Sequence, residues 1–162
     1  MTVAVRAAVL DDAAGIARVH VAAWRETHSR LLPEGALNRL DDELDGRTRR
    51  WHHILHDRTT TVLVTETAAG VVGWCSVGMA RDEDAPRELE LQGIYLLATH
   101  HGSGAGQTML DTGLGNRPAY LWSAVDNRRA QAFYRRNGFT ADGARKQYPL
   151  AGHSVSIARF VR

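Results

Sequence analysis

The stretch HHGSGAGQTML, from His100 to Leu110, places glycine at positions 102, 104 and 106, directly before a short apolar helical pattern. Glycine disfavours a helix by about 1 kcal/mol relative to alanine, so its recurrence here indicates that backbone rather than side chains is needed. Free N–H groups at a helix start, with the positive end of the helix dipole, bind anions. Without a Cβ, glycine lets the anion come close. The loop is therefore predicted to bind an anionic group; a flexible turn before a helix is the alternative.

Two common phosphate-binding loops do not match this stretch. A P-loop has Lys followed by Ser or Thr after its last glycine, whereas Gln107 and Thr108 stand here. The dinucleotide fingerprint is G-x-G-x-x-G, whereas these glycines run G-x-G-x-G. A nucleoside triphosphate or a dinucleotide is therefore disfavoured as the ligand.

Composition describes an ordinary globular chain. The 162 residues suit a single domain spanning 1–162, with 44% hydrophobic and 23% charged residues. The net charge is only +2 and the basic residues are scattered among acidic ones, so no nucleic-acid partner is expected. One cysteine, Cys75, suits a reducing compartment. The start of the chain lacks a signal-peptide pattern, and glycines and Glu66 interrupt the longest apolar region, so we expect a cytoplasmic protein without a membrane span.

Outward from the glycine loop, hydrophobic periodicity predicts a mixed α/β sheet, mostly antiparallel, with flanking helices. The expected strands are 3–7, 61–66, 71–79, 87–96, 119–125 and 154–161. The first expected helix begins at a cap on Asp11 and ends before 31–33. The other expected helices span 33–40, 42–57, the segment from the glycine loop to about 114, and 127–139. Strict alternation in 87–96 places Leu89, Leu91 and Tyr95 on one face, and Glu88, Glu90, Gln92, Ile94 and Leu96 on the other.

Two segments together resemble the GNAT superfamily of acetyl-CoA-dependent N-acetyltransferases. The run ELELQGIYLLATHHGSGAGQTML holds the family's loop signature from His101 to Gly106, and LWSAVDNRRAQAFYRRNGF holds its second element. In that second element the matching residues are Asn127, Phe133, Tyr134, Asn137, Gly138 and Phe139. The resemblance implies a central sheet splayed in the middle, and acetyl-CoA as cosubstrate without a metal.

The resemblance also implies how coenzyme A is bound. The loop amides would hold its pyrophosphate, the edge of 94–96 would pair with the pantetheine amides, and a bulge at Gly93 would make room for the thioester. Asn127 would bind the coenzyme, cap its own helix, or do both. The implied cofactor-binding residues are Ile94, Tyr95, Leu96, His101, Gly102, Ser103, Gly104, Ala105, Gly106, Gln107, Asn127 and Phe133.

Transfer of an acetyl group to an amine requires a base for the ammonium and an acid for the leaving thiolate. Glu90 lies just before the presumed bulge and is the expected base, directly or through a water; Glu88 is the substitute, and a solvated strand carboxylate is the alternative interpretation. Tyr134 matches the family's general acid, the alternative being a packing aromatic. A backbone N–H of the splayed strand would stabilise the oxyanion.

The acceptor is expected to be a primary amine of a small molecule, in a pocket lined by Trp24, His28 and Trp74, although core packing is the alternative for each. The acidic run 82–84 would attract a cationic acceptor, such as a polyamine, aminoglycoside or amino acid, or form a solvated turn. Acetylation of a protein or aminoacyl-tRNA amine, and a non-catalytic acyl-CoA-binding regulatory domain, are the other functions considered. A homodimer is compatible with the sequence.

Three histidines suggest other chemistry. His52 and His56 are four residues apart, as in zinc peptidases, but His53 replaces the catalytic glutamate and no third ligand is evident. No metal is therefore expected. HVAAWRETHSRLLP resembles one bacterial branch of the GNAT superfamily, in which tyrosine is frequent at the position of His28. An acceptor contact is therefore not carried over from the family to this residue.

Overall fold

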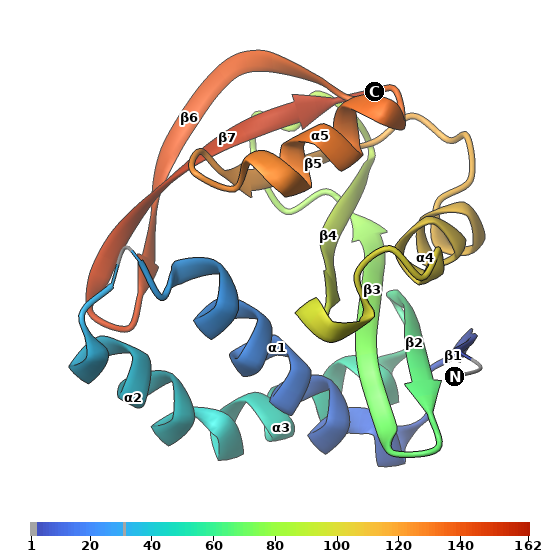
Figure 1. Cartoon of the computed structure of the whole chain (residues 1–162). Coiled ribbons are helices and arrows are strands. Elements are labelled where there is room, and N and C mark those ends of the chain that lie inside the picture. Colours follow the sequence, from blue (N-terminus) through green and yellow to red (C-terminus); the bar gives the residue numbers. More distant parts are fainter. Residues whose placement is uncertain (1–2, 31) are drawn as a thin grey trace.

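Seven strands form one open sheet in the order β1-β2-β3-β4-β5-β7-β6 (Figure 1). The computed structural model describes residues 3–30 and 32–162. Every neighbouring pair is antiparallel except β4 and β5, which confirms the predicted mixed, mostly antiparallel sheet. The strands are β1 Ala4–Ala7, β2 Thr61–Thr67, β3 Gly70–Met79, β4 Leu89–Leu96, β5 Tyr120–Ala124, β6 Thr140–Leu150 and β7 His153–Val161.

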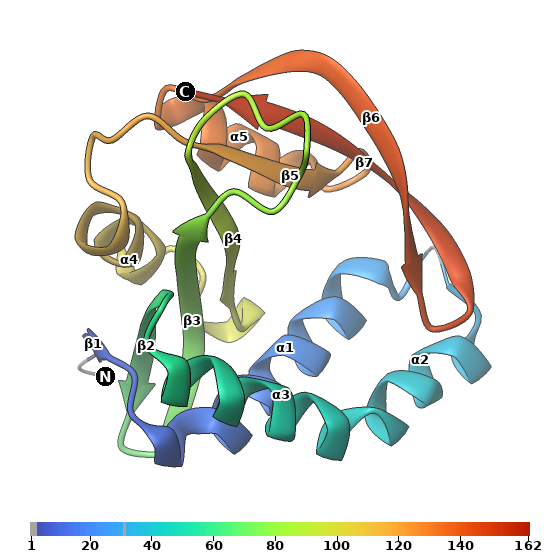
Figure 2. The same ribbon diagram turned by 180° about the vertical axis from the view of Figure 1, so that it is seen from behind.

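Within the described residues, five α-helices cover the two faces of the sheet (Figures 1 and 2). They are α1 Ala13–His28, α2 Glu34–Asp42, α3 Leu44–Asp57, α4 Ala105–Gly113 and α5 Arg128–Arg136, with short 3-10 helices at Leu10–Asp12 and Ala98–His100. On one face, residues of α4 and α5 share a core with β2, β3, β4, β5 and β7. On the other face, α1 and α3 pack on β2 and β3, and the end of α1 packs with α2 against β6 and β7.

The sheet opens between its two halves. β4 and β5 pair only at Glu90 and Tyr120, and beyond that point the strands diverge, as both ribbon views show. The edge of β4 that faces β5 is therefore left without strand partners from Leu91 onward. This divergence confirms the predicted splay in the middle of the sheet.

A bulge in β4 changes which side chains share a face. Ser76 pairs with Gly93 whereas Val77 pairs with Leu91, so Gln92 is an extra residue between them. The alternation predicted from sequence is therefore wrong past the bulge. Ile94 joins Leu91 in the core beneath α4, while Tyr95 lies on the α1 side of the sheet. The expected bulge occurs at Gln92, next to Gly93.

Gly93 is required by a close approach rather than by its backbone conformation. A Cβ at this position would lie 2.5 Å from the Trp74 indole. The bulge and the tryptophan therefore fit each other only when residue 93 has no side chain.

The sequence predicted the end of α5 correctly but not the start of α1. The cap expected at Asp11 is wrong: α1 follows the 3-10 turn, and the neighbouring Asp12 carboxylate makes no cap bond but accepts from both terminal nitrogens of Arg6. The expected end of α5 is correct, because Gly138 has φ 82° and its N–H bonds to the Arg135 carbonyl, which is a Schellman cap. Of the predicted helix stop at 31–33, Leu31 lies outside the described residues.

The expected strand 154–161 is β7, whereas its hairpin partner β6 was not predicted from the sequence. β6 is exposed over most of its length, so it lacks an alternating apolar face. From the edge of the sheet the hairpin arches across to α2 (Figure 2), where Leu150 and Val155 join the core of α1 and α2. Two nitrogens of Arg39 donate to the Ala151 carbonyl and fasten its tip.

Candidate active site

The glycine loop has the geometry of an anion cradle. Gly102 and Gly104 adopt positive φ values of 80° and 84°, and a Cβ at either would meet no atom within 4 Å. Gly104 is the N-cap of α4, so the free amides of the first turn start here. Gly106 has a helical conformation, and its nearest neighbour would be Phe133 at 4.0 Å. The alternate glycines therefore leave backbone amides open to a ligand.

A first cavity of about 910 Å³ extends from this loop into the opening between β4 and β5. We call it the donor cavity. Of the predicted cofactor-binding residues it is lined by Ile94, Tyr95, Leu96, His101, Gly102, Gly104, Gly106, Gln107, Asn127 and Phe133. Ser103 and Ala105 do not line it: Ala105 is buried, and its N–H donates to the Ser103 hydroxyl.

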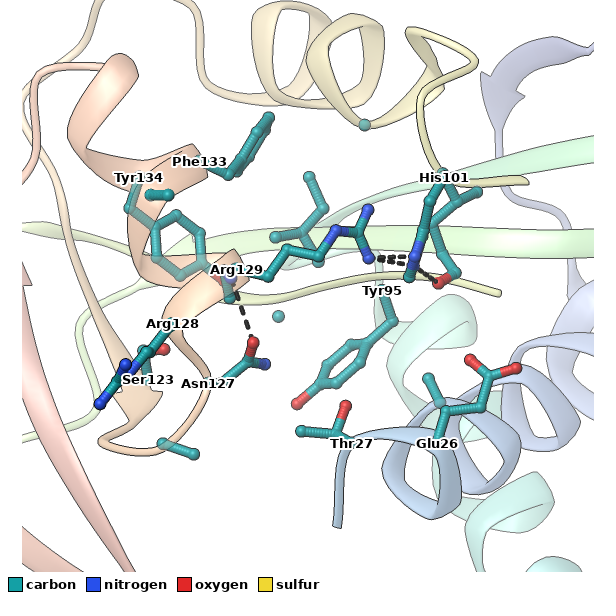
Figure 3. A pocket seen from close by; sticks show the side chains of 18 of the residues that line it. Glu26, Thr27, Tyr95, His101, Ser123, Asn127, Arg128, Arg129, Phe133 and Tyr134 are labelled. Atoms are coloured by element: carbon teal, nitrogen blue, oxygen red, sulfur yellow. Dashed lines mark hydrogen bonds between the residues drawn. The ribbon is translucent and has the colours of Figure 1, made fainter. Parts of the chain in front are cut away.

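Figure 3 shows the donor cavity with α5 on one side and the end of β4 on the other. The Asn127 side chain accepts from the Ala130 N–H, 3.1 Å away, so it does cap α5. Arg129 reaches from α5 across to His101. The Nε2–H of His101 is best assigned as donating to the Leu96 carbonyl at 2.8 Å, which leaves Nδ1 to accept from Arg129.

Three arginines on this wall were not among the predicted site residues. Arg128, Arg129 and Arg136 all line the donor cavity. Partial burial lowers the pKa of Arg129 from its ordinary value, and the charge of Arg136 lowers it further, so positive charges are gathered here. The sequence signal was the pair of adjacent arginines at 128 and 129.

Tyr134 points its ring into the donor cavity from α5. Its side chain is buried against Phe139 and Phe160, with ring centroids 6.2 and 6.3 Å away. Burial raises the pKa of the Tyr134 hydroxyl above its ordinary value, so the phenol keeps its proton at neutral pH. A phenol in this state is able to donate a proton to a thiolate.

A second cavity, of about 520 Å³, lies on the α1 and α3 side of β4, beneath the β6–β7 hairpin. We call it the acceptor cavity. Trp24, His28 and Trp74 all line it, as does Trp122, so the structure brings these side chains together. The residues that line both cavities are Trp24, His28, Gln92, Tyr95, Trp122 and Ala124. The two cavities therefore meet at the bulge of β4.

Glu90 faces the acceptor cavity, whereas the exposed Glu88 lines neither cavity. The Glu90 side chain is only 4% exposed, and both its oxygens are bonded to Arg81 at 2.7 and 2.9 Å. The Tyr120 hydroxyl adds a longer contact of 3.3 Å. A carboxylate held in this way can accept a proton directly only after one of these hydrogen bonds breaks. Otherwise it can act as a base only through a water.

Two carboxylates of the acidic run 82–84 are paired with other side chains. Asp82 accepts bonds from Lys146, Trp122 and Tyr120. Burial alone would raise the pKa of Asp82, but these three bonds outweigh it and lower the pKa to about 2. Asp84 pairs with Arg159. Asp82 and Asp84 thus tie the loop to β5, β6 and β7, whereas Glu83 is exposed and has no ion pair within the described residues.

The half-buried His20 and the buried His28 border the acceptor cavity. Burial, followed by the charges of Arg47 and Arg50, lowers the pKa of His20 to about 3. Burial also lowers the pKa of His28. The Nδ1 atoms of both rings are buried without a hydrogen-bond partner. Both rings are therefore neutral at pH 7 and have an unused ring nitrogen.

The remaining sequence candidates lie away from both cavities. His52, His53 and His56 are exposed on α3, and the described part of the chain contains no group of three or more residues able to hold a metal ion. Cys75 is fully buried, and burial raises the pKa of its thiol to about 12. No helix within 3–30 or 32–162 is both long and apolar enough to cross a bilayer.

Comparison with known sequences identifies the family. Residues 58–141 match the family model described as the acetyltransferase (GNAT) domain. A Bacillus subtilis protein named as the uncharacterised N-acetyltransferase YuaI is 33% identical over 116 residues, which are 68% of this chain and 62% of that protein. The uncharacterised N-acetyltransferase Mb2688 of Mycobacterium bovis is 29% identical over 82% of this chain and 84% of its own length. The chain belongs to the GNAT family of acetyltransferases.

Solved structures share the fold over the whole chain. A GCN5-related N-acetyltransferase from Rhodopseudomonas palustris aligns with a TM-score of 0.73 at 17% identity, covering 100% of this chain and 96% of that one. The PaiA N-acetyltransferase of Thermoplasma acidophilum, solved in complex with coenzyme A, aligns with a TM-score of 0.71 at 15% identity and 98% coverage of both chains. The yncA protein of Salmonella typhimurium, solved with acetyl-CoA, has a TM-score of 0.68 at 18% identity, covering 100% and 94%.

Proposed function

We propose that this chain transfers an acetyl group from acetyl-CoA to the primary amine of a small molecule. The observation that carries the proposal is the meeting of two cavities at the bulge of β4, one beginning at a glycine cradle and the other enclosed by aromatic side chains. Direct transfer requires that the thioester and the amine reach one point from different sides. The shared lining residues provide that point.

The donor cavity has groups for each part of coenzyme A. The amides around Gly102 and Gly104 would bind the pyrophosphate, and Arg128 and Arg129 would neutralise phosphate charge. The unpaired edge of β4 from Leu91 onward would pair with the pantetheine amides in the manner of an added strand. Coenzyme A supplies an activated acetyl thioester. The relatives solved with coenzyme A or acetyl-CoA have the same fold, which supports this ligand.

In the proposed reaction the amine nitrogen attacks the thioester carbonyl carbon, the new C–N bond forms and the C–S bond breaks. A backbone N–H near the bulge would stabilise the charge that develops on the carbonyl oxygen. Tyr134 would give its hydroxyl proton to the departing sulfur. Its buried, protonated phenol in the donor cavity supports this role.

Glu90 is proposed to take the proton from the amine through a water, because Arg81 occupies its oxygens. His28 is a second candidate for this step. It lines both cavities and its Nδ1 is buried without a partner, so a neutral imidazole nitrogen is available where donor and acceptor would meet.

The size of the acceptor cavity supports a small-molecule acceptor. A volume of about 520 Å³ falls within the usual range of about 300–1,000 Å³ for small-ligand sites. The β6–β7 hairpin arches over this side of the sheet (Figure 2), which leaves less access for a folded protein.

A screen of amines with acetyl-CoA, following release of the free thiol, tests the proposal. Turnover of a small primary amine, with the N-acetyl product identified by mass spectrometry, is the expected result. Acetyl-CoA binding without turnover of any small amine would favour the non-catalytic regulatory domain. Acetylation confined to added protein or aminoacyl-tRNA would favour the macromolecular acceptor.

A further inference from the structure

The side of α3 that lines the acceptor cavity carries two arginines. Arg47, Arg50, Trp51 and Ile54 line the cavity, and their spacing of three, four and seven residues places them on one side of the helix. Trp51 and Ile54 are the apolar residues expected on such an inner side. Arg47 and Arg50 share this side although they are charged: Arg47 is half-buried, and the exposed Arg50 borders the cavity. Their position indicates an anionic ligand.

The charges around the cavity do not balance. Its cationic lining residues are Arg47, Arg50, Arg81 and Lys146, and its anionic ones are Asp82 and Glu90. Each carboxylate already has a cation, since Lys146 pairs with Asp82 and Arg81 with Glu90. Arg50 has no ion pair within the described ranges, and the partner of Arg47 is Glu43, which lines neither cavity. Since Arg47 is paired with Glu43, the unbalanced positive charge beside the cavity is that of Arg50.

Buried donors without partners lie in the same wall. Within the described residues, Nε of Arg47 and Nε1 of Trp74 are buried and have no hydrogen-bond partner. Buried polar groups are normally paired. Both atoms are donors only, so the partner they lack is an acceptor such as a carboxylate oxygen.

Aromatic rings form the rest of the wall. Trp51 and Trp74 have ring centroids 4.6 Å apart, and Trp74 and Tyr95 4.9 Å apart. The Arg47 guanidinium lies 4.6 Å from the centroid of Trp24, which belongs to both cavities. An anionic group at Arg47 would therefore lie beside the point where the amine must react.

We propose that the acceptor is an amino acid or a close analogue, a small primary amine whose carboxylate is bound by Arg47 and Arg50 and whose apolar side chain packs against the tryptophans. This inference rests on the proposed acetyl transfer. The bound carboxylate would balance the excess positive charge.

The test compares each common L-amino acid with the amine obtained by removing its carboxylate, such as phenylalanine with phenethylamine. At least one amino acid should exceed its decarboxylated partner in kcat/KM by about 10- to 100-fold, the range of a hydrogen bond between charged groups. Arg47→Gln and Arg50→Gln should each reduce that ratio by raising KM for the amino acid. Arg49→Gln is the matched control, because it removes the same charge from the same helix at a residue that lines neither cavity.

Two different failures can be told apart. If simple amines are acetylated as well as or better than every amino acid, or if Arg47→Gln and Arg50→Gln leave the ratio unchanged, the inference is wrong and acetyl transfer stands. If no amine is acetylated, the proposed function fails. Calorimetry with coenzyme A present then compares N-acetyl-L-phenylalanine with N-acetylphenethylamine. Tighter binding of the carboxylate, lost in Arg47→Gln, supports the anion site, and equal or weaker binding overturns it.

Discussion

Arg81 holds both carboxylate oxygens of Glu90, with Nη2 2.7 Å from Oε1 and Nε 2.9 Å from Oε2. The carboxylate is buried, whereas the Arg81 side chain is 54% exposed and belongs to the loop after β3. Such a pair has two interpretations. Either Glu90 is a catalytic base whose reaction does not depend on Arg81, or Glu90 is an anchor through which Arg81 holds the loop that also carries Asp82.

Substitution of each partner separates these roles. If Glu90 passes the proton through a water, Glu90→Gln should lower kcat by about 100-fold or more, within the range of one acid–base group. Arg81→Met keeps the carboxylate and removes only the guanidinium, so it should retain kcat to within about tenfold. Steady-state kinetics with one good acceptor measures both. Equal losses in the two variants would make Glu90 an anchor for Arg81 and leave His28 as the base.

Tyr134→Phe tests the proton donor. The substitution keeps the ring that packs against Phe139 and Phe160 and removes only the hydroxyl, so the melting temperature and the affinity for acetyl-CoA should change little. The values of kcat and kcat/KM should fall together by roughly 10- to 1000-fold, since the interaction is made mainly in the transition state. Wild-type turnover in this variant would show that Tyr134 is a packing residue.

The sequence foretold the site best where chemistry depends on backbone. The glycine loop and the cap at Gly138 each require a particular residue type at a fixed spacing, so they could be predicted from the residues. The splay of the sheet was predicted only from the resemblance to the GNAT superfamily. The faces of β4 past Gln92 could not be predicted, because one extra residue in a strand exchanges its two faces. The resemblance implied a bulge at Gly93, but the strict alternation of 87–96 gave no sign of it; the exchange follows from pairing with β3 and from the Trp74 ring against Gly93.

Ion pairs between residues far apart in the sequence could not be predicted either. The acidic run 82–84 suggested attraction of a cation, yet Asp82 bonds to Lys146, 64 residues later. Conversely, Arg47 and Arg50 looked like ordinary surface charges of a polar helix. They line a cavity because α3 packs beside α1 and because the β6–β7 hairpin, itself unforeseen, closes the other side.

Binding of the coenzyme through backbone is tested at Gly106, which has a helical conformation and a clear path into the donor cavity. Gly106→Val should weaken acetyl-CoA binding by about 1–3 kcal/mol, the scale of donors deprived of their partner. Gly35→Val is the matched control, since Gly35 is also the second residue of its helix and its Cβ would meet no atom within 4 Å. Calorimetry with acetyl-CoA should show normal affinity for this control; normal affinity in both variants would contradict backbone binding.

The last prediction concerns acid stability and His20. Its ring is surrounded by Trp24, Trp74 and Tyr95, and burial together with Arg47 and Arg50 lowers its pKa from 6.5 to about 3. Between these values the unfolded chain binds one more proton than the folded one, so the free energy of unfolding should decrease as the pH falls from about 6.5. The contribution of one proton is at most about 1.4 kcal/mol per pH unit. His20→Gln should reduce this slope in urea titrations between pH 6.5 and 4. An unchanged slope in His20→Gln would mean that the imidazole takes up its proton over the same pH range in the folded and the unfolded chain. Burial and the charges of Arg47 and Arg50 would then not lower its pKa.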